Sequence, residues 1–462
     1  MNEEKIIEEL GDISPEYVRE AREAGPKRRP IIRAAAIAAA ALIAVVGIGA
    51  LIKTALPFGG TKGIGTDGEK SFYSGDGLIM AGKTVFLNSE KRWESAKTAE
   101  SIEPFVSHIN SELMKETDGN VVWSPASVYT ALGMLAECAD GDTLKEILSV
   151  LGADSVNDVR KNAAAIIKAE TLDEEGSVVS IENSLWLNSK YGFDTNVLNT
   201  LSESFNASSY WADPKDERFS RALRSWLDSA SAGFLNEEAQ SYGLDPDMLF
   251  SIYSVCFYKS AWRGLYNEAL TYEGAFRSPS GETPCSFMRK RDQNMFCAFR
   301  EDFSAVYENT RTGGVLLMLP DEGVSVEEML GRGGYDMIFD RSPDLSQYSV
   351  DLTVPKLDVF SNTDLIPVLR RAGVKTCFVP GAGDVSPLTG ESLFVSEISH
   401  SARLATDEEG VAAAAFTAVT VPTTDEPSDD HAVFVFDRPF VMVILGRSGT
   451  PLFIAVINVP ND

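Results

Sequence analysis

The sequence predicts an α+β fold, and three observations support that class. Helical periodicity comes early in the domain, whereas alternating or continuous β patterns dominate its later part. Strand and helix patterns do not alternate regularly, which argues against a doubly wound parallel sheet. With 462 residues, of which 44% are hydrophobic and 24% charged, the chain is long enough for a large core and lacks the composition of a disordered protein.

The chain begins with a charged helical pattern, residues 1–33, followed by an apolar stretch, residues 34–52. As a helix, this uncharged stretch would extend roughly 28 Å, enough to cross the core of a bilayer. Four basic residues precede it and one follows directly: Lys27, Arg28, Arg29 and Arg33, then Lys53. By the positive-inside rule, we expect residues 1–33 in the cytoplasm and the remainder outside.

Two alternatives to an uncleaved transmembrane helix remain open. A cleaved signal peptide is disfavoured because the leading region is long and no clear A-x-A site follows the apolar stretch. An alanine-rich buried helix is disfavoured by the flanking bases. We therefore expect a single-pass protein of the cell membrane whose C-terminal domain is extracytoplasmic.

A linker rich in glycine and polar residues, 53–92, separates this helix from a globular domain at 93–462. Helical periodicity within the domain covers 125–151 and 217–240. The β patterns lie at 179–187, 249–259, 313–319, 349–354, 393–399 and 432–458. No repeat of roughly 20–50 residues is visible, so we treat residues 93–462 as one domain.

Charge and cysteine content exclude several classes of partner. Residues 1–53 hold eight acids and eight bases, so the net charge of −27 falls entirely on the remainder. Such a domain is repelled by phosphate backbones and anionic lipids, and we expect no nucleic-acid partner. The five cysteines are scattered and lack C-x-x-C or zinc spacing, which indicates buried or reduced thiols, with a Cys285–Cys297 pair as the alternative. No cofactor or metal site is predicted.

Catalytic motifs are nearly absent. GLIMAGKT, Gly77 to Thr84, fits the phosphate-loop pattern, but no strand pattern precedes it and no helical pattern follows, so we interpret it as a chance match. The three histidines, His108, His400 and His431, have no G-x-S-x-G, H-E-x-x-H or S-x-x-K motif around them. A hydrolase without such a motif is the least favoured hypothesis.

One segment, EEGVAAAAFTAVTVP at 408–422, has no clear local preference. Thr406 and Glu409 are spaced like a capping box and the alanines favour helix, which indicates a short surface helix. The β-branched run that follows favours an extended chain, and Pro422 disfavours helical geometry before it.

Several segments of the domain resemble one known family. They are NVVWSPASVYTALGMLAECADGDTLKEIL, FYKSAWRGLY, GVLLMLPDEG, VDLTVPKLDVFSNTDLIPVLRRAGVKTCF, LFVSEISHSARLATDEEGVAAAA and FDRPFVMVILGRSGTPLFIAVINVP. Together, in this order and over roughly residues 93–462, they resemble the serpins, a family of serine protease inhibitors. The resemblance implies three β-sheets, the largest central, with eight or nine helices and an exposed reactive-centre loop. With the N-terminal helix, the chain resembles a membrane-anchored, bacterial-type member.

The resemblance implies inhibition by a conformational trap. A target protease cleaves the loop, forms its acyl-enzyme and is carried along as the freed loop enters the large sheet as a new strand. The positions that match the hinge of this loop are Glu408, Glu409, Gly410, Val411, Ala412, Ala413, Ala414 and Ala415. By the family's alternation, the core-facing residues are Val411, Ala413, Ala415 and Thr417. None of these is charged, so each can be buried in a sheet.

Two residues of this loop depart from the family. Val411 replaces the usual Thr or Ser, but it is apolar and should still insert. Phe416 replaces a small residue, on the face opposite the core. Neither resembles the charged or proline-bearing hinge of non-inhibitory members.

Two further groups match family positions beneath the strand that opens. The polar cluster, called the shutter, corresponds to Asn120, Ser124, Ser127, Ser254 and His400. Ser254 stands where the family generally has Asn, so one hydrogen bond is lost or carried by water. Trp262 matches the tryptophan at the breach, where insertion begins. Without the resemblance, His400 would be a satisfied buried histidine and Trp262 an ordinary core aromatic.

The reactive bond is placed by family spacing. Counting from the hinge puts it between Thr424 and Asp425, whereas counting back from the FDRPF motif gives Ser428. We adopt the first count, because the inserted length controls where the protease is left. A small neutral residue there, with no Arg or Lys in 404–437, favours elastase- or subtilisin-like serine proteases, with cysteine proteases as a further class. We expect a membrane-tethered, monomeric inhibitor and not an enzyme; a non-inhibitory binding or scaffold module is the alternative.

Overall fold

The computed structural model divides the chain into two units, Met1–Ile64 and Gly65–Asp462. It describes residues 78–80 and 102–461, apart from 116–118, 175, 340–344, 380, 391–394, 396–397 and 412–429. The expected cytoplasmic segment, membrane helix and reactive bond therefore lie outside the described residues, as do Ala412–Ala415. Within the described part of the chain, no helix is both long and apolar enough to span a membrane.

The α-helices of the described residues are α4 (Glu103–Leu113), α5 (Pro125–Cys138), α6 (Gly141–Leu151), α7 (Val156–Glu170), α8 (Thr195–Phe205), α9 (Glu217–Ala230), α10 (Asn236–Ala239), α11 (Val326–Met329), α12 (Tyr335–Phe339) and α13 (Leu365–Ala372). A π-helical turn, Leu330–Gly334, joins α11 to α12 as one interrupted helix. Counted so, the described residues hold nine helices, as the resemblance implied. Single 3₁₀ turns lie at Glu268–Leu270 and Thr376–Phe378.

Helix α5 is almost entirely buried, and local sequence fixes its start. Ser124 is its N-cap, with a side chain that accepts a hydrogen bond from the Ser127 backbone N–H, and Pro125 occupies the first helical position. Gly133 allows close packing against α8, because a Cβ atom there would lie 2.7 Å from the Phe205 ring. The helix therefore forms a fixed support beneath the first sheet.

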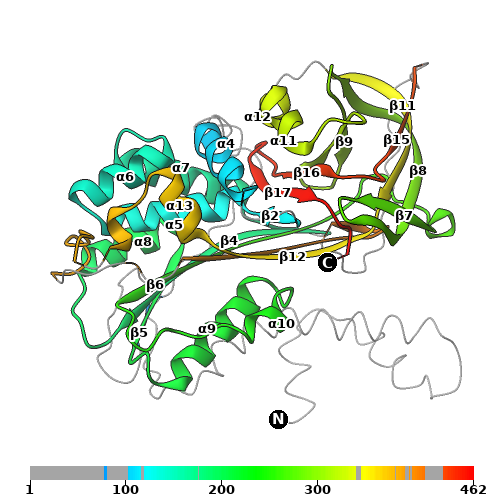
Figure 1. Ribbon diagram of the computed structural model, residues 1–462. Coiled ribbons are helices and arrows are strands. Elements are labelled where there is room, and N and C mark those ends of the chain that lie inside the picture. Colours follow the sequence, from blue (N-terminus) through cyan, green and yellow to red (C-terminus); the bar gives the residue numbers. More distant parts are fainter. Residues whose placement is uncertain are drawn as a thin grey trace, which may run out of the picture. The chain divides into compact units, whose positions relative to one another are not determined.

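The first sheet has eight strands in the order β1-β5-β4-β6-β14-β13-β12, with β3 paired to β4. These strands are β1 (Leu78–Met80), β3 (Leu172–Glu174), β4 (Ser177–Asn188), β5 (Ala207–Ala212), β6 (Phe250–Ala261), β12 (Leu357–Asp364), β13 (Ser399–Thr406) and β14 (Gly410–Val411). Helices α5 to α8 and α13 lie over one face of this sheet, and α9 and α10 lie over the other (Figure 1). The sheet is thus covered on both faces.

The second sheet has nine strands in the order β15-β11-β8-β9-β10-β16-β17-β2, with β7 also paired to β8. These strands are β2 (Val121–Trp123), β7 (Tyr272–Ser278), β8 (Gly281–Phe299), β9 (Phe303–Asn309), β10 (Gly314–Pro320), β11 (Ser346–Pro355), β15 (His431–Val435), β16 (Phe440–Leu445) and β17 (Pro451–Ile457). We expected three sheets, but strand pairing among the described residues gives two. The reason is β8, whose 19 residues pair with β7 at one end and with β9 at the other.

Two minor expectations are settled by these strands. Residues 78–80, inside the phosphate-loop match, form a strand paired with β5, which agrees with a chance match. All five cysteines are free. Cys285 and Cys297 lie on the same strand, β8, twelve residues apart, or roughly 40 Å along an extended chain. The alternative of a disulfide between them is wrong.

Candidate functional site

The hinge segment forms a short strand in the middle of the first sheet. Gly410 pairs with Ala261 and Val411 with Ser260 on β6, and Val411 also pairs with Thr406 on β13. A Cβ atom at Gly410 would lie only 2.5 Å from the Ser260 carbonyl oxygen, so a residue with a side chain would push the two strands apart. Val411 is 1% exposed. The hinge therefore already occupies the first two positions of a strand between β6 and β13.

A tight turn, not a helix, connects β13 to β14. The Asp407 carboxylate accepts hydrogen bonds from the backbone N–H groups of Glu409 and Gly410, at 2.9 and 3.1 Å. Thr406 ends β13, and its hydroxyl accepts a hydrogen bond from the Leu357 backbone N–H. The capping-box spacing of Thr406 and Glu409 does not lead to a helix, because Asp407 captures these N–H groups first.

Glu408 anchors this turn to the neighbouring segments. Its carboxylate lies 2.7 Å from the Lys356 ammonium and accepts a hydrogen bond of 2.6 Å from the Thr271 hydroxyl. Burial alone would raise the pKa of Glu408, but these partners hold it below its ordinary value. Glu408 is therefore charged at neutral pH and is fixed in place at the base of the loop.

Trp262 holds the same turn from the β6 side. Its indole Nε1–H donates to the Asp407 carbonyl oxygen at 2.8 Å, and its backbone N–H donates to the Glu409 carbonyl oxygen at 3.0 Å. The ring is 3% exposed and packs edge-on against Tyr266, with centroids 5.8 Å apart. The resemblance placed Trp262 at the point where insertion begins, and the structure places it against the turn that leads into Gly410 and Val411.

A buried ion pair near Trp262 was missed from the sequence. The Lys290 ammonium on β8 lies 2.5 Å from the Glu308 carboxylate on β9, and the two side chains are 6% and 2% exposed. Burial raises the pKa of Glu308, although Lys290 opposes the shift. Charged residues in strand patterns normally indicate a solvated face, so no sequence signal separated this pair from surface charges.

The shutter residues meet where α5, β6 and β13 approach one another. His400 on β13 accepts a hydrogen bond through Nε2 from the Ser124 backbone N–H at 3.0 Å. The Ser127 hydroxyl donates to the Ser254 hydroxyl on β6 at 2.8 Å. Thr130, which the sequence did not single out, lies 3.3 Å from the Ser254 hydroxyl. Four of the five expected shutter residues are thus brought together.

Asn120 does not belong to this cluster. Its side chain binds the segment after β17, with the amide nitrogen donating to the Val459 carbonyl at 2.7 Å. Its side-chain oxygen accepts from the backbone N–H groups of Asn458 and Val459. The three-residue strand β2 separates Asn120 from Ser124, so an extended chain carries it away from the cluster. Its hydrogen bonds therefore differ from those of the other four residues assigned to the shutter.

Burial lowers the pKa of His400 to about 4, so its ring is neutral at pH 7. Because Nε2 accepts the Ser124 N–H, the ring proton is on Nδ1. Among the described residues, no hydrogen bond joins His400 to Ser254. The two strands that carry them are therefore not linked across the sheet at this level.

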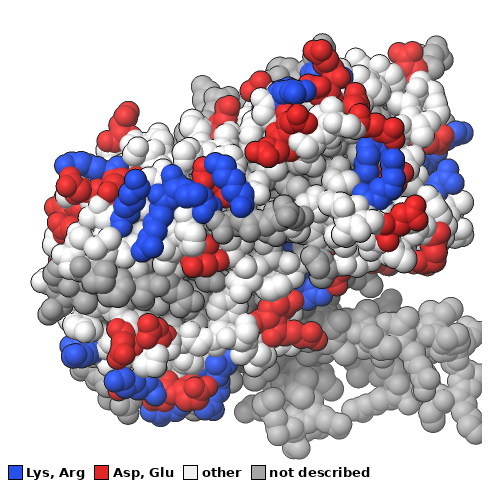
Figure 2. Space-filling model, viewed as in Figure 1, with Lys and Arg blue, Asp and Glu red and all other residues white. Residues whose placement is uncertain are grey.

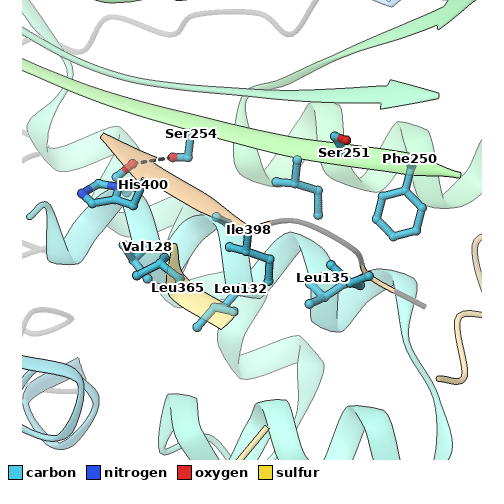
Figure 3. A pocket seen from close by; sticks show the side chains of 13 residues that line it. Val128, Leu132, Leu135, Phe250, Ser251, Ser254, Leu365, Ile398 and His400 are labelled. Atoms are coloured by element: carbon cyan, nitrogen blue, oxygen red, sulfur yellow. Dashed lines mark hydrogen bonds between the residues drawn. The ribbon is translucent and has the colours of Figure 1, made fainter. Parts of the chain in front are cut away.

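Beyond Val411, towards the N-terminal ends of β6 and β13, no strand pairing joins these two strands in the described part of the sheet. We call this direction down the sheet. We call this unpaired boundary the seam. Among the described residues, three small cavities lie along it. The upper one includes Tyr258, Leu404 and Val411 in its lining. The lower one lies between α5, β6 and β13 at the level of Ser254 and His400 (Figure 3).

The third cavity lies between the seam and residues 217–242, which contain α9 and α10 and which we call the α9–α10 segment. Residues of this segment bind strands on the far side of the seam: Arg403 lies 3.2 Å from Glu238, and the Tyr242 hydroxyl donates to Asn362. The segment therefore bridges the seam on the face opposite α5.

The face of the molecule shown in Figure 2 has Lys and Arg in small groups beside Asp and Glu.

Comparisons with known proteins agree with this arrangement. A profile of the family "Serpin (serine protease inhibitor)" matches residues 100–460. A serpin-like protein of Thermococcus kodakarensis is 28% identical over 383 residues, covering 78% of this chain and 86% of that protein. Serpin-ZX of Arabidopsis thaliana is 25% identical over 363 residues, covering 74% and 93%.

Solved structures show the same fold. The thermophilic serpin tengpin in its native state superposes with a TM-score of 0.68 at 22% identity, covering 82% of this chain and 97% of that one. Thyroxine-binding globulin in complex with thyroxine gives a TM-score of 0.69 at 20% identity, covering 79% of this chain and 100% of that one. Because the family profile matches residues 100–460, more than half of the chain, the chain belongs to the serpin family.

Proposed function

We propose that this chain inhibits serine proteases of the elastase or subtilisin type by loop cleavage, acyl-enzyme trapping and insertion of the loop into the first sheet. The observation that carries the proposal is the pairing of Gly410 and Val411 between β6 and β13 above an unpaired seam. A sheet with one strand position begun and the rest unpaired is ready to accept the residues that follow. The serpin homologues suggest the same general activity.

The register of β14 defines where each following residue would go. Each step of two along the loop moves two residues down β6 and two down β13. Ala413 would then lie between Tyr258 and Leu404, beside the upper cavity. Ala415 would lie between Cys256 and Ala402.

Two steps further than Ala413, Thr417 would lie between Ser254 and His400. Its hydroxyl can accept a hydrogen bond from His400 and donate one to Ser254, which would link β6 and β13 at this level. Small side chains at 413 and 415 suit the narrow upper part of the seam.

Insertion would supply hydrogen bonds that both strands lack. Backbone N–H and C=O groups along the seam edges of β6 and β13 have no strand partner among the described residues, and each satisfied bond contributes about 1 kcal/mol. In the proposed reaction, the protease serine attacks the carbonyl carbon of Thr424, the bond to the Asp425 nitrogen breaks, and the new amine leaves. The acyl ester stays on Thr424 and moves with the loop.

The remaining parts of the proposal rest on the sequence. Thr424 and Asp425 suit a protease pocket for small neutral residues, and cysteine proteases are a further class. The apolar stretch 34–52 supports tethering to the cell membrane with this domain outside, and we propose that the domain acts as a monomer without a cofactor. The scissile residues and the membrane stretch lie outside the described residues.

A gel assay tests the proposal. The purified chain is incubated with pancreatic elastase and with subtilisin, and we expect a denaturant-resistant complex whose cleavage maps to 424–425. A second measurement compares thermal unfolding before and after nicking of the loop, and we expect a rise in Tm after nicking. Complete cleavage with no complex and an unchanged Tm would favour a non-inhibitory binding module. Thyroxine-binding globulin, described in complex with thyroxine, has the same fold.

A further inference from the structure

The strand that follows the loop, β15, forms an open edge of the second sheet. It stands at the end of the strand order of that sheet, and it pairs in parallel with β11, from Ser349 opposite His431 to Thr353 opposite Val435. Among the described residues, no strand pairs with its other edge. β15 lies at the end of the domain opposite α6 and α13 (Figure 1). An open edge of this kind can pair with an extended segment of another chain.

Hydrogen bonds at the two ends of β15 show which of its backbone groups face outward. The Asp430 carbonyl accepts from the Ser349 N–H at 2.8 Å, and the Phe436 N–H donates to the Thr353 carbonyl at 3.0 Å. The N–H and C=O groups of one residue point to the same edge of a strand, and those of the next residue point to the other edge. The even-numbered residues of β15 therefore bond to β11, and the odd-numbered ones turn their backbone groups to the open edge.

The side chains of the odd-numbered residues make this edge apolar. Val433 is 63% exposed and Val435 is 37% exposed, whereas Ala432 and Phe434 are buried. Charged residues and proline normally protect an exposed edge strand from pairing. The sequence of β15, HAVFV, contains no Lys, Arg, Asp, Glu or Pro. The strand thus combines exposed apolar side chains with backbone donors and acceptors that pair with no strand of the described part of the chain.

The length of the loop on each side of the proposed reactive bond indicates what covers this edge. Asp425 precedes His431 by six residues, which reach at most roughly 20 Å. On the other side, Thr424 follows Val411 by thirteen residues, which reach roughly 45 Å. A protease of about 240 residues has a radius of gyration of about 18 Å. While such a protease holds the bond in its active site, its body lies against β15, whereas the hinge can stay clear of it.

We propose that the open edge of β15, His431–Val435, is a docking surface for the protease that cleaves the loop. This rests on the proposed function, which supplies that partner. The edge fits the rim of the protease cleft on the side that binds residues after the reactive bond, where that rim is apolar and offers backbone groups for pairing. A second copy of this chain is disfavoured there, because each copy carries a net charge of −27. Docking speeds formation of the first complex and selects among proteases with similar pockets.

The rate of loop cleavage tests docking whether or not the protease is trapped. The intact chain is mixed with active subtilisin, and the second-order rate constant for loss of the intact chain is measured on gels. Val433→Lys places a residue that protects edge strands in the middle of the open edge. Because Val433 is largely exposed, the variant should fold normally, and its rate constant should be at least tenfold lower than that of the unaltered chain.

A matched control separates docking from the change in net charge. Val379→Lys makes the same substitution at a valine that is 48% exposed. Val379 follows the 3₁₀ turn Thr376–Phe378, which is bound to α6 by hydrogen bonds to Glu146, at the end of the domain away from β15 (Figure 1). Its rate constant should stay within about twofold of that of the unaltered chain, and thermal unfolding checks that both variants are folded. Equal rate constants for the two variants would overturn the docking surface.

A second variant tests the backbone groups of the edge. Val433→Pro removes an N–H that points away from β11 and keeps an apolar side chain, and proline is tolerated at such positions of edge strands. The folded variant should be cleaved at least fivefold more slowly than the unaltered chain. An unchanged rate constant would refute pairing at the open edge.

The fraction of lost chain that ends in a denaturant-resistant complex separates failure of docking from failure of the proposed function. β15 belongs to the second sheet, whereas the loop would enter the first, so this fraction should be the same for Val433→Lys and the unaltered chain. If Val433→Lys is cleaved more slowly but neither chain forms a complex, the docking surface stands and the proposed inhibition is refuted. If Val433→Lys forms the complex at the unaltered rate, the docking surface is refuted and the proposed inhibition stands.

Discussion

A charge placed on the core-facing side of the loop gives a sharp test of the proposed insertion. Ala415→Asp puts a carboxylate where the β14 register brings residue 415 between Cys256 and Ala402. Ala402 is 3% exposed, and neither neighbour offers a positive charge. To enter the sheet at pH 7, the new Asp must be protonated, about three pH units above its ordinary pKa, which costs about 4 kcal/mol. That cost corresponds to a roughly thousandfold lower tendency to insert.

The matched control places the same carboxylate on the neighbouring residue, whose side chain would point to the opposite face of the sheet. Ala414→Asp would point to the other side of the sheet, between Phe257 and Arg403. The Arg403 guanidinium lies on that face, paired with Asp358 and Glu238, so a carboxylate there meets a cation and partial solvent. We expect Ala414→Asp to trap protease within about threefold of the unaltered chain.

The assay measures the fraction of subtilisin or elastase held in denaturant-resistant complex per chain cleaved, and the gain in Tm on nicking. Ala415→Asp should be cleaved as a substrate, with little complex and a much smaller gain in Tm. Lowering the pH to 5.5 reduces the protonation cost to about 2 kcal/mol and should restore part of the trapping. The reasoning is refuted if Ala415→Asp traps normally while Ala414→Asp does not, because the register would then place the wrong face inward.

Three further changes test the hinge and the shutter through stability. Trp262→Phe removes the indole donor to the Asp407 carbonyl and should lower the free energy of unfolding by about 1–2 kcal/mol in urea titration; an unchanged midpoint would contradict this. Glu408→Gln removes the ion pair with Lys356, for about 1 kcal/mol at pH 7 because the lysine is partly exposed. Folding lowers the pKa of Glu408, so its contribution to the free energy of unfolding is present above about pH 4.5 and is lost below that. The difference in stability between Glu408→Gln and the unaltered chain should therefore become smaller as the pH falls. His400 has its pKa lowered from 6.5 to about 4, so its stability is fully present above about pH 6.5, and roughly 3 kcal/mol is lost as the pH falls to 4. His400→Gln should show a smaller loss over that range, and an equal loss would assign the pH dependence to other groups.

Elements with strong local patterns could be predicted from the sequence. The helical pattern at 125–151 contains α5 and α6, and the β patterns at 249–259 and 313–319 contain most of β6 and β10. Boundaries were less certain, because tertiary contacts decide them. The pattern at 217–240 is not one helix but contains two, α9, which ends at Ala230, and the short α10. The strand expected at 393–399 lies partly outside the described residues, and β13 begins at Ser399. The half-buried Arg403 of β13 donates to Glu238 in α10, and a charged residue in this position weakens the strand pattern in the sequence.

Local sequence patterns were also too weak to identify the residues of the site. Glu408, Trp262, Ser124, Ser127, Ser254 and His400 were found only through the family resemblance, since no local pattern marks them. The Lys290–Glu308 pair has no sequence signal at all, because the two residues are 18 positions apart, on the different strands β8 and β9. Asn120 matched a family position of the shutter, but its side chain binds the segment after β17 and not the other four residues.

The unpaired seam explains why the hinge is held by so many directed contacts. A strand position open in the middle of a covered sheet leaves backbone groups of two strands without partners, so insertion of any suitable peptide is favourable. Trp262, Lys356 and Thr271 all bind the turn at 407–409. These contacts hold the turn in place while the two residues of β14 are paired. These contacts fix where the loop begins to insert but add nothing below Val411. In the proposed mechanism, the barrier to premature insertion therefore lies beyond Val411, where contacts hold the two sides of the seam in place. These are the shutter contacts on one face and the Arg403 and Tyr242 contacts of the α9–α10 segment on the other. If so, changes at the shutter will alter the rate of insertion, whereas changes at the hinge will alter mainly its starting point.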